Sequence, residues 1–247
     1  MKDRLMTIEI VTDKEFELLI RMLTHDLEKL ITITSRVLKR LVEGSLTLEN
    51  PRHRSLVQSS FYSMERSKKM IADLNDTIAN RKLNVSIKPC NIAELIDKVA
   101  DSFAPIAHNE NISFEKNIEN PEIVIDSDPD LLTRIIENYL YNAISHTETR
   151  GYIKLSLKSE NKSEKNSCVI CVENSGSTIP EDDLNKIFNV GVQLNLRQKR
   201  YWRGSGLGLA FCKMAAEAIG AEVGAVNLSE ETGVIFYCSF ASIKNNL

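Results

Sequence analysis

The chain has 247 residues, enough for one or two domains of about 150 residues each with a buried core. Apolar residues make up 43% and charged residues 26%, which is typical of globular proteins and excludes disorder as a description of the whole chain. The net charge of −3 excludes a global positive field that would hold nucleic acid or an anionic membrane surface.

The sequence also carries information about the compartment. No apolar run reaches the ~20 residues of a membrane-spanning helix, and the residues from Met1 to Asp3 do not open a secretory signal. The five cysteines are an odd number without the spacing of a disulfide framework, and the pair Cys168 and Cys171 is expected in the core rather than on zinc. We therefore expect a cytoplasmic protein without a membrane segment.

The first regular pattern runs from Asp13 to Glu43, a segment without Gly or Pro. Its apolar positions alternate in spacing between four and three residues, which is the seven-residue repeat of a helix that packs on a partner helix. Gly44 is expected to end this helix, and residues 45–51 to form a turn. The stripe consists of Phe16, Ile20, Leu23, Leu27, Leu30, Thr34, Val37 and Leu41, with Thr34 as its polar member.

A second segment without Gly or Pro, from Arg52 to about Arg81, has a less regular apolar side. Two long helices joined by a short turn predict an antiparallel hairpin, which cannot bury both of its faces alone. We therefore predict that two copies pair into a four-helix bundle, making a homodimer; the alternative is a hairpin packed on the rest of its own chain. The predicted domains are residues 1–83 and 84–247.

His25 lies off the apolar stripe of the first helix, and Asp26 follows it directly. An exposed imidazole beside a carboxylate can act as a nucleophile whose tautomer the carboxylate holds. A lone histidine is more often an ordinary surface or core residue, so this pair needs support from the rest of the chain.

After residue 82 helical and strand patterns alternate. Asp128 is the expected cap of a helix that has Pro129 at its first position. The polar stretch 159–167 is expected to be a hairpin loop, and the last two strands to pair antiparallel. This order predicts an α/β two-layer sandwich. The expected helices are 91–103, 129–146 and 205–219, and the expected strands are 112–114, 123–125, 152–157, 168–172, 222–226 and 234–240.

Two polar groups on this scaffold are candidate site residues. Asn138 and Asn142 are four apart on one helix face, and their carboxamide oxygens suit Mg²⁺ held mainly by nucleotide phosphates and water. Asn174 and Gly176 follow a strand, where the backbone can approach a flat ligand. Taken alone, the first pair is more often a solvated or capping pair, and the second a simple turn.

A third group precedes the last predicted helix. Glycines spaced by two, at Gly204, Gly206 and Gly208, bring backbone N–H groups against phosphate at a helix N-terminus. The segment before them is rich in cations and contains Tyr201 and Trp202, a mixture that fits either a lid over a triphosphate or binding of single-stranded nucleic acid. The cations are Arg197, Lys199, Arg200 and Arg203.

The order of these features resembles the catalytic core of two-component sensor histidine kinases, over residues from about 13 to 240. The resemblance implies an α+β fold in which a long helical hairpin, dimeric as a four-helix bundle, precedes a Bergerat-type ATP-binding sandwich shared with gyrase, chaperone and mismatch-repair ATPases. The matching segments are the phosphoacceptor box at 24–27, the N box at 138–143, the first glycine box at 174–176, the phenylalanine box at 187–188 and the second glycine box at 204–209.

The resemblance also implies an activity. The chain would bind ATP and Mg²⁺, autophosphorylate on His25 and pass the phosphoryl group to an aspartate of a response-regulator receiver domain, with Asp26 orienting the ring and taking up its proton. The implied ligand contacts are Asn142 to Mg²⁺ with Asn138 in support, Asn174 and Gly176 to adenine, Gly204, Gly206 and Gly208 to the phosphates, and one or more of the lid cations, Arg197, Lys199 and Arg203 among them, to the β or γ phosphate.

Four positions depart from the family pattern. Asn174 stands where an aspartate is usual, which removes a charge-assisted hydrogen bond worth ~1–2 kcal/mol. Thr178 replaces a glycine, which should stiffen the loop, and Leu30 replaces a proline, which removes a helix bend. Lys29 replaces the Thr or Asn that positions water in many members, and for this reason we expect weak phosphatase activity. The main alternative is a histidine phosphotransfer or scaffold protein whose ATP-binding domain is degenerate; a serine kinase or simple ATPase of the same superfamily would leave the front hairpin unexplained.

Overall fold

The computed structural model describes residues 4–9, 27–28, 31–32, 34–50, 53–54, 56–57, 60–61, 64, 71, 82–162, 165–189, 207–229 and 232–243. The chain divides into two compact units, one made of Met1–Ile8 with Asn84–Leu247 and the other of Glu9–Leu83. In the described part of the chain, no helix combines the length and the apolar character that crossing a membrane requires.

The larger unit is built on a five-stranded sheet in the order β3-β5-β6-β8-β7. Strand β3 runs parallel to β5, and the other neighbours are antiparallel. A smaller sheet has the order β1-β2-β4. The bounds are β1 Arg4–Glu9, β2 Lys82–Asn91, β3 Ser113–Ile118, β4 Val124–Ser127, β5 Tyr152–Lys162, β6 Lys165–Ser175, β7 Glu222–Asn227 and β8 Gly233–Ile243.

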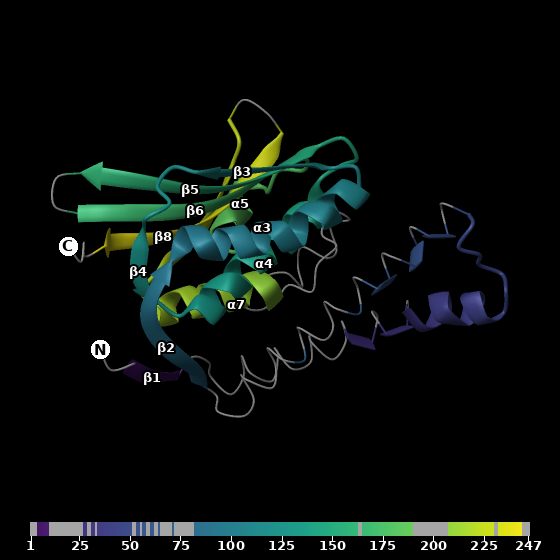
Figure 1. Cartoon of the computed structure of the whole chain (residues 1–247), viewed down its shortest axis with the longest axis horizontal. Coiled ribbons are helices and arrows are strands. Elements are labelled where there is room, and N and C mark those ends of the chain that lie inside the picture. Colours follow the sequence, from purple (N-terminus) through teal and green to yellow (C-terminus); the bar gives the residue numbers. More distant parts are fainter. Residues whose placement is uncertain are drawn as a thin grey trace. The chain divides into compact units, whose positions relative to one another are not determined.

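Three helices, α3 (Ile92–Asn109), α4 (Pro129–His146) and α7 (Leu207–Ala218), lie along one face of the five-stranded sheet, as Figure 1 shows. A single turn, α5 (Glu181–Leu184), follows β6. The core lies between the layers, where Tyr139 of α4 is fully buried and its hydroxyl donates to the backbone oxygen of Tyr237 in β8 at 3.1 Å. The prediction of an α/β sandwich is confirmed.

Local capping explains where the helices begin. The Asp128 carboxylate accepts hydrogen bonds from the backbone N–H groups of Asp130 and Leu131, and Pro129 occupies the first turn of α4. Asn91 caps α3 in the same way through the backbone N–H of Glu94. Helix α3 continues six residues beyond the predicted end at Phe103, because Pro105 is accommodated inside it.

Two features of the sheets differ from the expectation. The hairpin predicted at 159–167 is present, but its described residues belong to the strands, because β5 continues to Lys162, β6 begins at Lys165 and their residues pair in register throughout. The polar side chains do not prevent this, since the backbone ladder is satisfied whatever the side chains are. Strand β2 was not expected, because its sequence shows no clear alternation and contains Pro89.

Cys168 and Cys171 are core residues, as expected, and the other three cysteines are buried as well. All five are buried free thiols, and the described residues contain no group of three or more His, Cys, Asp and Glu side chains that could hold a metal ion. Burial raises the pKa of Cys168 and of Cys238 to about 12, so neither thiol ionises near neutral pH.

The smaller unit contains helical residues on both sides of a turn. Residues 34–42 are helical and Gly44, with φ of +71°, follows them at the predicted stop. The buried hydroxyl of Thr34 donates to the backbone oxygen of Ser60 at 3.5 Å, so residues on the two sides of the turn are in contact. The complete hairpin extends beyond the described residues and stays a prediction.

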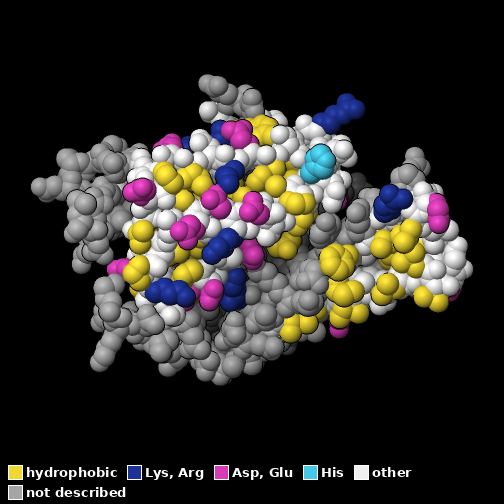
Figure 2. Space-filling view, viewed as in Figure 1, with side chains coloured by type: hydrophobic (Ala, Val, Ile, Leu, Met, Phe, Trp, Pro, Cys, Tyr) yellow, Lys and Arg dark blue, Asp and Glu magenta, His cyan; other side chains and the backbone are white. Residues whose placement is uncertain are grey.

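Large apolar side chains remain exposed on this smaller unit, and yellow side chains gather there in the space-filling view of Figure 2. Thr34 and Val37 of the predicted stripe are buried, whereas a neighbouring helix face is open. That face carries Ile31, Leu38 and Val42, which are 58%, 51% and 89% exposed.

Candidate functional site

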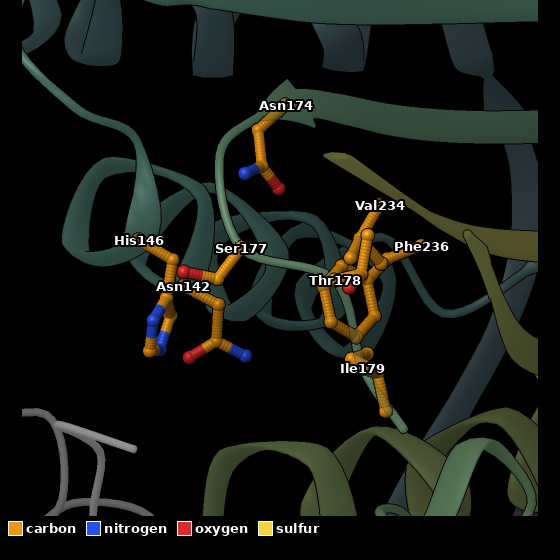
Figure 3. Close-up of a pocket in the computed structure, with 8 residues that line it drawn as sticks. All are labelled: Asn142, His146, Asn174, Ser177, Thr178, Ile179, Val234 and Phe236. Atoms are coloured by element: carbon orange, nitrogen blue, oxygen red, sulfur yellow. The ribbon is translucent and has the colours of Figure 1, made fainter. Parts of the chain in front are cut away.

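A pocket lies where β6 leaves the sheet, beside the C-terminal end of α4 (Figure 3). One of its sides is apolar, and the other carries two carboxamides and an imidazole. Such a pocket suits a flat ligand that has a polar edge. Its lining consists of Asn142, His146, Asn174, Ser177, Thr178, Ile179, Val234 and Phe236.

Asn174 is the most buried polar group of the pocket, with 2% of its surface exposed. Its side-chain nitrogen donates to the backbone oxygen of Ser175 at 2.8 Å. Figure 3 shows the side-chain oxygen turned toward the cavity, on the side where Thr178 and Phe236 lie. The carboxamide is therefore held by its donor end and presents its acceptor end to a ligand.

Gly176 allows the chain to turn sharply after Asn174. Its φ of +127° is one that residues with a side chain rarely adopt, and a Cβ at this position would lie 2.4 Å from the backbone oxygen of His146. Its N–H donates to the backbone oxygen of Thr232 at 3.1 Å. The first glycine box thus packs directly on the end of α4.

Asn138 and Asn142 are half-buried on the same face of α4, but only Asn142 lines the pocket. Asn138 lies one turn earlier, against Gly208 in the first turn of α7, where a Cβ would lie 2.9 Å from the Asn138 side-chain oxygen. The structure therefore brings the N box next to the second glycine box. No acceptor within the described part of the chain reaches the buried side-chain nitrogen of Asn138.

These features allow a test of whether a nucleotide with Mg²⁺ fits. A buried amide donor that no acceptor among the described residues reaches, on a side chain whose oxygen lies near Gly208 in the first turn of α7, suits a phosphate oxygen. Asn142 offers a neutral oxygen, which suits an ion that takes its other ligands from phosphates and water. Asn138 and Asn142 therefore suit a nucleotide with Mg²⁺.

His25, Asp26, Arg197, Lys199, Arg203, Gly204 and Gly206 lie outside the described residues.

Sequence reasoning missed part of the site. His146 was not among the predicted site residues, yet it lines the pocket beside Asn142. Val234 and Phe236 line the pocket from β8, about sixty positions after Asn174 in the chain. Side chains of a strand alternate between its two faces, and this pattern identified β8 as a strand but did not indicate a ligand.

Comparison with known proteins shows similarity to histidine kinases and related ATPases. Residues 127–242 match the family of histidine kinase-, DNA gyrase B- and HSP90-like ATPases. The adaptive-response sensory kinase SasA of Synechococcus sp. (strain JA-3-3Ab) is 26% identical over 200 residues, which are 80% of this chain and 52% of that kinase. The chain thus spans about half the length of this relative.

Two solved structures extend the comparison. The nucleotide-free catalytic domain of histidine kinase ThkA is 28% identical, with a TM-score of 0.54, over 64% of this chain and 96% of that one. The structure of ThkA in complex with response regulator protein TrrA is 22% identical, with a TM-score of 0.62, over 91% of this chain and 61% of that one, which is a likeness of fold.

Proposed function

The chain carries the catalytic core of a two-component histidine kinase, and from this premise we propose that it is an ATP-dependent protein-histidine kinase that autophosphorylates on His25. It then transfers the phosphoryl group to an aspartate of a response-regulator receiver domain.

One observation carries the proposal: a pocket for a flat ligand and a place for phosphate are adjacent on α4. Asn142 lines the pocket, and one turn earlier Asn138 has its side-chain oxygen near Gly208 and a side-chain nitrogen that meets no acceptor among the described residues. In the proposed complex the Asn174 side-chain oxygen accepts from the adenine amino group, and Ile179 and Phe236 contact the ring. The triphosphate extends toward α7, with Gly204, Gly206 and the lid cations completing its contacts.

The proposed reaction needs positioning more than covalent chemistry from the protein. A ring nitrogen of His25 attacks the γ-phosphorus, the bond from that phosphorus to the β–γ bridging oxygen breaks, and ADP leaves. Asp26 holds the ring and takes up the imidazole proton. Mg²⁺, held by Asn142, supplies neutralisation of the phosphate charge when it is bound.

The proposed partners are a response regulator and a second copy of the chain. Histidine kinase ThkA, solved in complex with response regulator protein TrrA, resembles this chain in fold, which supports the first partner. The open apolar face of the smaller unit supports pairing of two copies.

We propose weak phosphatase activity, because the ammonium of Lys29 can only donate and cannot position an attacking water. Five buried free thiols support a reducing, cytoplasmic location.

The test is incubation with γ-labelled ATP and Mg²⁺, comparing the unaltered protein with His25→Gln and, as a matched control, His108→Gln at the exposed end of α3. We expect acid-labile label in the unaltered protein and in His108→Gln, and none in His25→Gln. Label that survives in His25→Gln would place the acceptor elsewhere.

The second candidate is a phosphotransfer or scaffold protein whose ATP-binding domain is degenerate. Asn174 in place of an acidic residue and Thr178 in place of a glycine favour it. Calorimetric titration with ATP and Mg²⁺ separates the two functions, because only the kinase binds the nucleotide.

A further inference from the structure

Asn227, the last residue of edge strand β7, makes a set of hydrogen bonds that its place in the strand does not require. Its side-chain oxygen accepts from the backbone N–H of Ile179 at 2.9 Å. Its side-chain nitrogen donates to the backbone oxygen of Ile179 at 2.7 Å and to a carboxylate oxygen of Glu181 at 3.2 Å. The carboxamide thus pairs with both backbone groups of one residue, as a neighbouring strand would.

The residue that Asn227 holds is part of the pocket. Ile179 is 3% exposed and lines the cavity next to Thr178. Its buried N–H and C=O groups need partners, and Asn227 supplies one for each from 48 positions away in the sequence.

The segment between β6 and α5 is thereby tied at two points to the β7–β8 hairpin. Gly176 at its start donates to the backbone oxygen of Thr232, and Ile179 near its end is held by Asn227. Ser177 and Thr178, which line the pocket, lie between these two ties. The position of these two residues in the pocket wall is therefore fixed from the edge strand.

We propose that Asn227 is a positioning residue for the nucleotide: it keeps the 177–179 wall at the spacing at which an adenine ring fills the pocket. This rests on the proposed function, because it takes the ligand to be an adenine nucleotide. Asn227 has no place in the lining itself, so it acts through Ile179.

The test measures the Kd for ADP by calorimetry and the kcat and KM for ATP in autophosphorylation. In Asn227→Ala we expect the Kd and KM to rise about tenfold, while kcat at saturating ATP stays within about twofold. Asn117→Ala, which removes an exposed asparagine from the other edge strand, is the matched control and should bind as the unaltered protein does.

A rescue distinguishes positioning from general stability. In Asn227→Asp the carboxylate keeps the bond from the Ile179 N–H but faces the Ile179 oxygen and the Glu181 carboxylate, so we expect binding weaker than in Asn227→Ala. Adding Glu181→Gln supplies a donor and should recover most of that additional loss. Should Asn227→Ala fail to fold, the double variant Asn227→Asp with Glu181→Gln decides the question, because its carboxylate still accepts from the Ile179 N–H; its Kd for ADP should lie above that of the unaltered protein, and an unchanged Kd would overturn the inference.

Unchanged Kd and KM in the Asn227 variants would overturn the inference, and so would a fall in kcat at constant KM. If the unaltered protein binds no ADP, the proposed function fails first and the inference with it. If the unaltered protein binds and the variants bind equally well, only the inference fails.

Discussion

At the scale of single residues, Gly208 is a position where a substitution should change ligand affinity without lowering the stability of the fold. Gly208 lies in the first turn of a helix, where alanine is favoured by up to ~1 kcal/mol. A Cβ there would lie 2.9 Å from the Asn138 side-chain oxygen, so this carboxamide must move. The glycine is therefore better explained by the space that the Asn138 side chain needs than by the helix itself.

We expect Gly208→Ala to leave the thermal midpoint of the nucleotide-free protein unchanged or higher, and to raise the Kd for ATP with Mg²⁺ about tenfold because Asn138 is displaced. Differential scanning fluorimetry and calorimetry measure the two quantities. Unchanged affinity would show that Asn138 does not contact the nucleotide.

Gly176 differs because both its backbone angle and its surroundings exclude a side chain. Gly176→Ala would combine a positive φ with a Cβ 2.4 Å from the His146 oxygen, so we expect a loss of roughly 3 kcal/mol or more in the free energy of unfolding. Gly220→Ala is the matched control, since its φ of +72° is also positive but nothing lies within 4 Å; we expect a loss of only ~1 kcal/mol. Urea denaturation measures both, and equal losses would contradict the role of the clash.

At the scale of secondary structure, the helices could be predicted because their signals are local. Asp128 and Pro129 mark the start of α4 within two residues, and Gly44 marks a helix stop. The strands were harder, because pairing partners decide them: the polar half of the β5–β6 hairpin forms a ladder only because each strand meets the other.

The same distinction applies to the site. Asn138, Asn142, Asn174 and Gly176 could be named from short motifs. Phe236 reaches the pocket through strand pairing, and Asn227 holds the lining residue Ile179 through a side chain that crosses from another strand. A local sequence pattern contains neither relation.

Asp128 connects helix α4 with strand β2 through hydrogen bonds of its side chain. Asp128 is only 4% exposed. One of its carboxylate oxygens caps α4, and the other accepts from the backbone N–H of Ser86 in β2 at 2.7 Å. We expect Asp128→Ala to lose ~2–4 kcal/mol, because a cap and a buried backbone donor are lost together. Chemical denaturation measures the loss, and the exposed Asp130→Ala in the same turn should lose less than ~1 kcal/mol. Similar losses would mean that Asp128 acts only as a charge near the helix end.

At the scale of the whole molecule, the smaller unit presents more apolar surface than a stable monomeric hairpin is expected to expose. The buried Thr34 and the exposed Leu38 and Val42 lie on adjacent faces of one helix, and contact across the turn covers only the first. A second copy placed on the open face would give a four-helix bundle.

Charge placed on that open face should therefore separate the subunits. We expect Leu38→Glu combined with Val42→Glu to convert a dimer into a monomer in sedimentation equilibrium, because two carboxylates would have to be buried in each half of the interface. Arg36→Glu is the control: it also adds negative charge, but its side chain is exposed about 160° around the helix from Leu38 at 100° per residue, and it should remain dimeric. If the unaltered protein sediments as a monomer, the open face is not a dimer interface, and His25 would have to receive its phosphoryl group within a single chain.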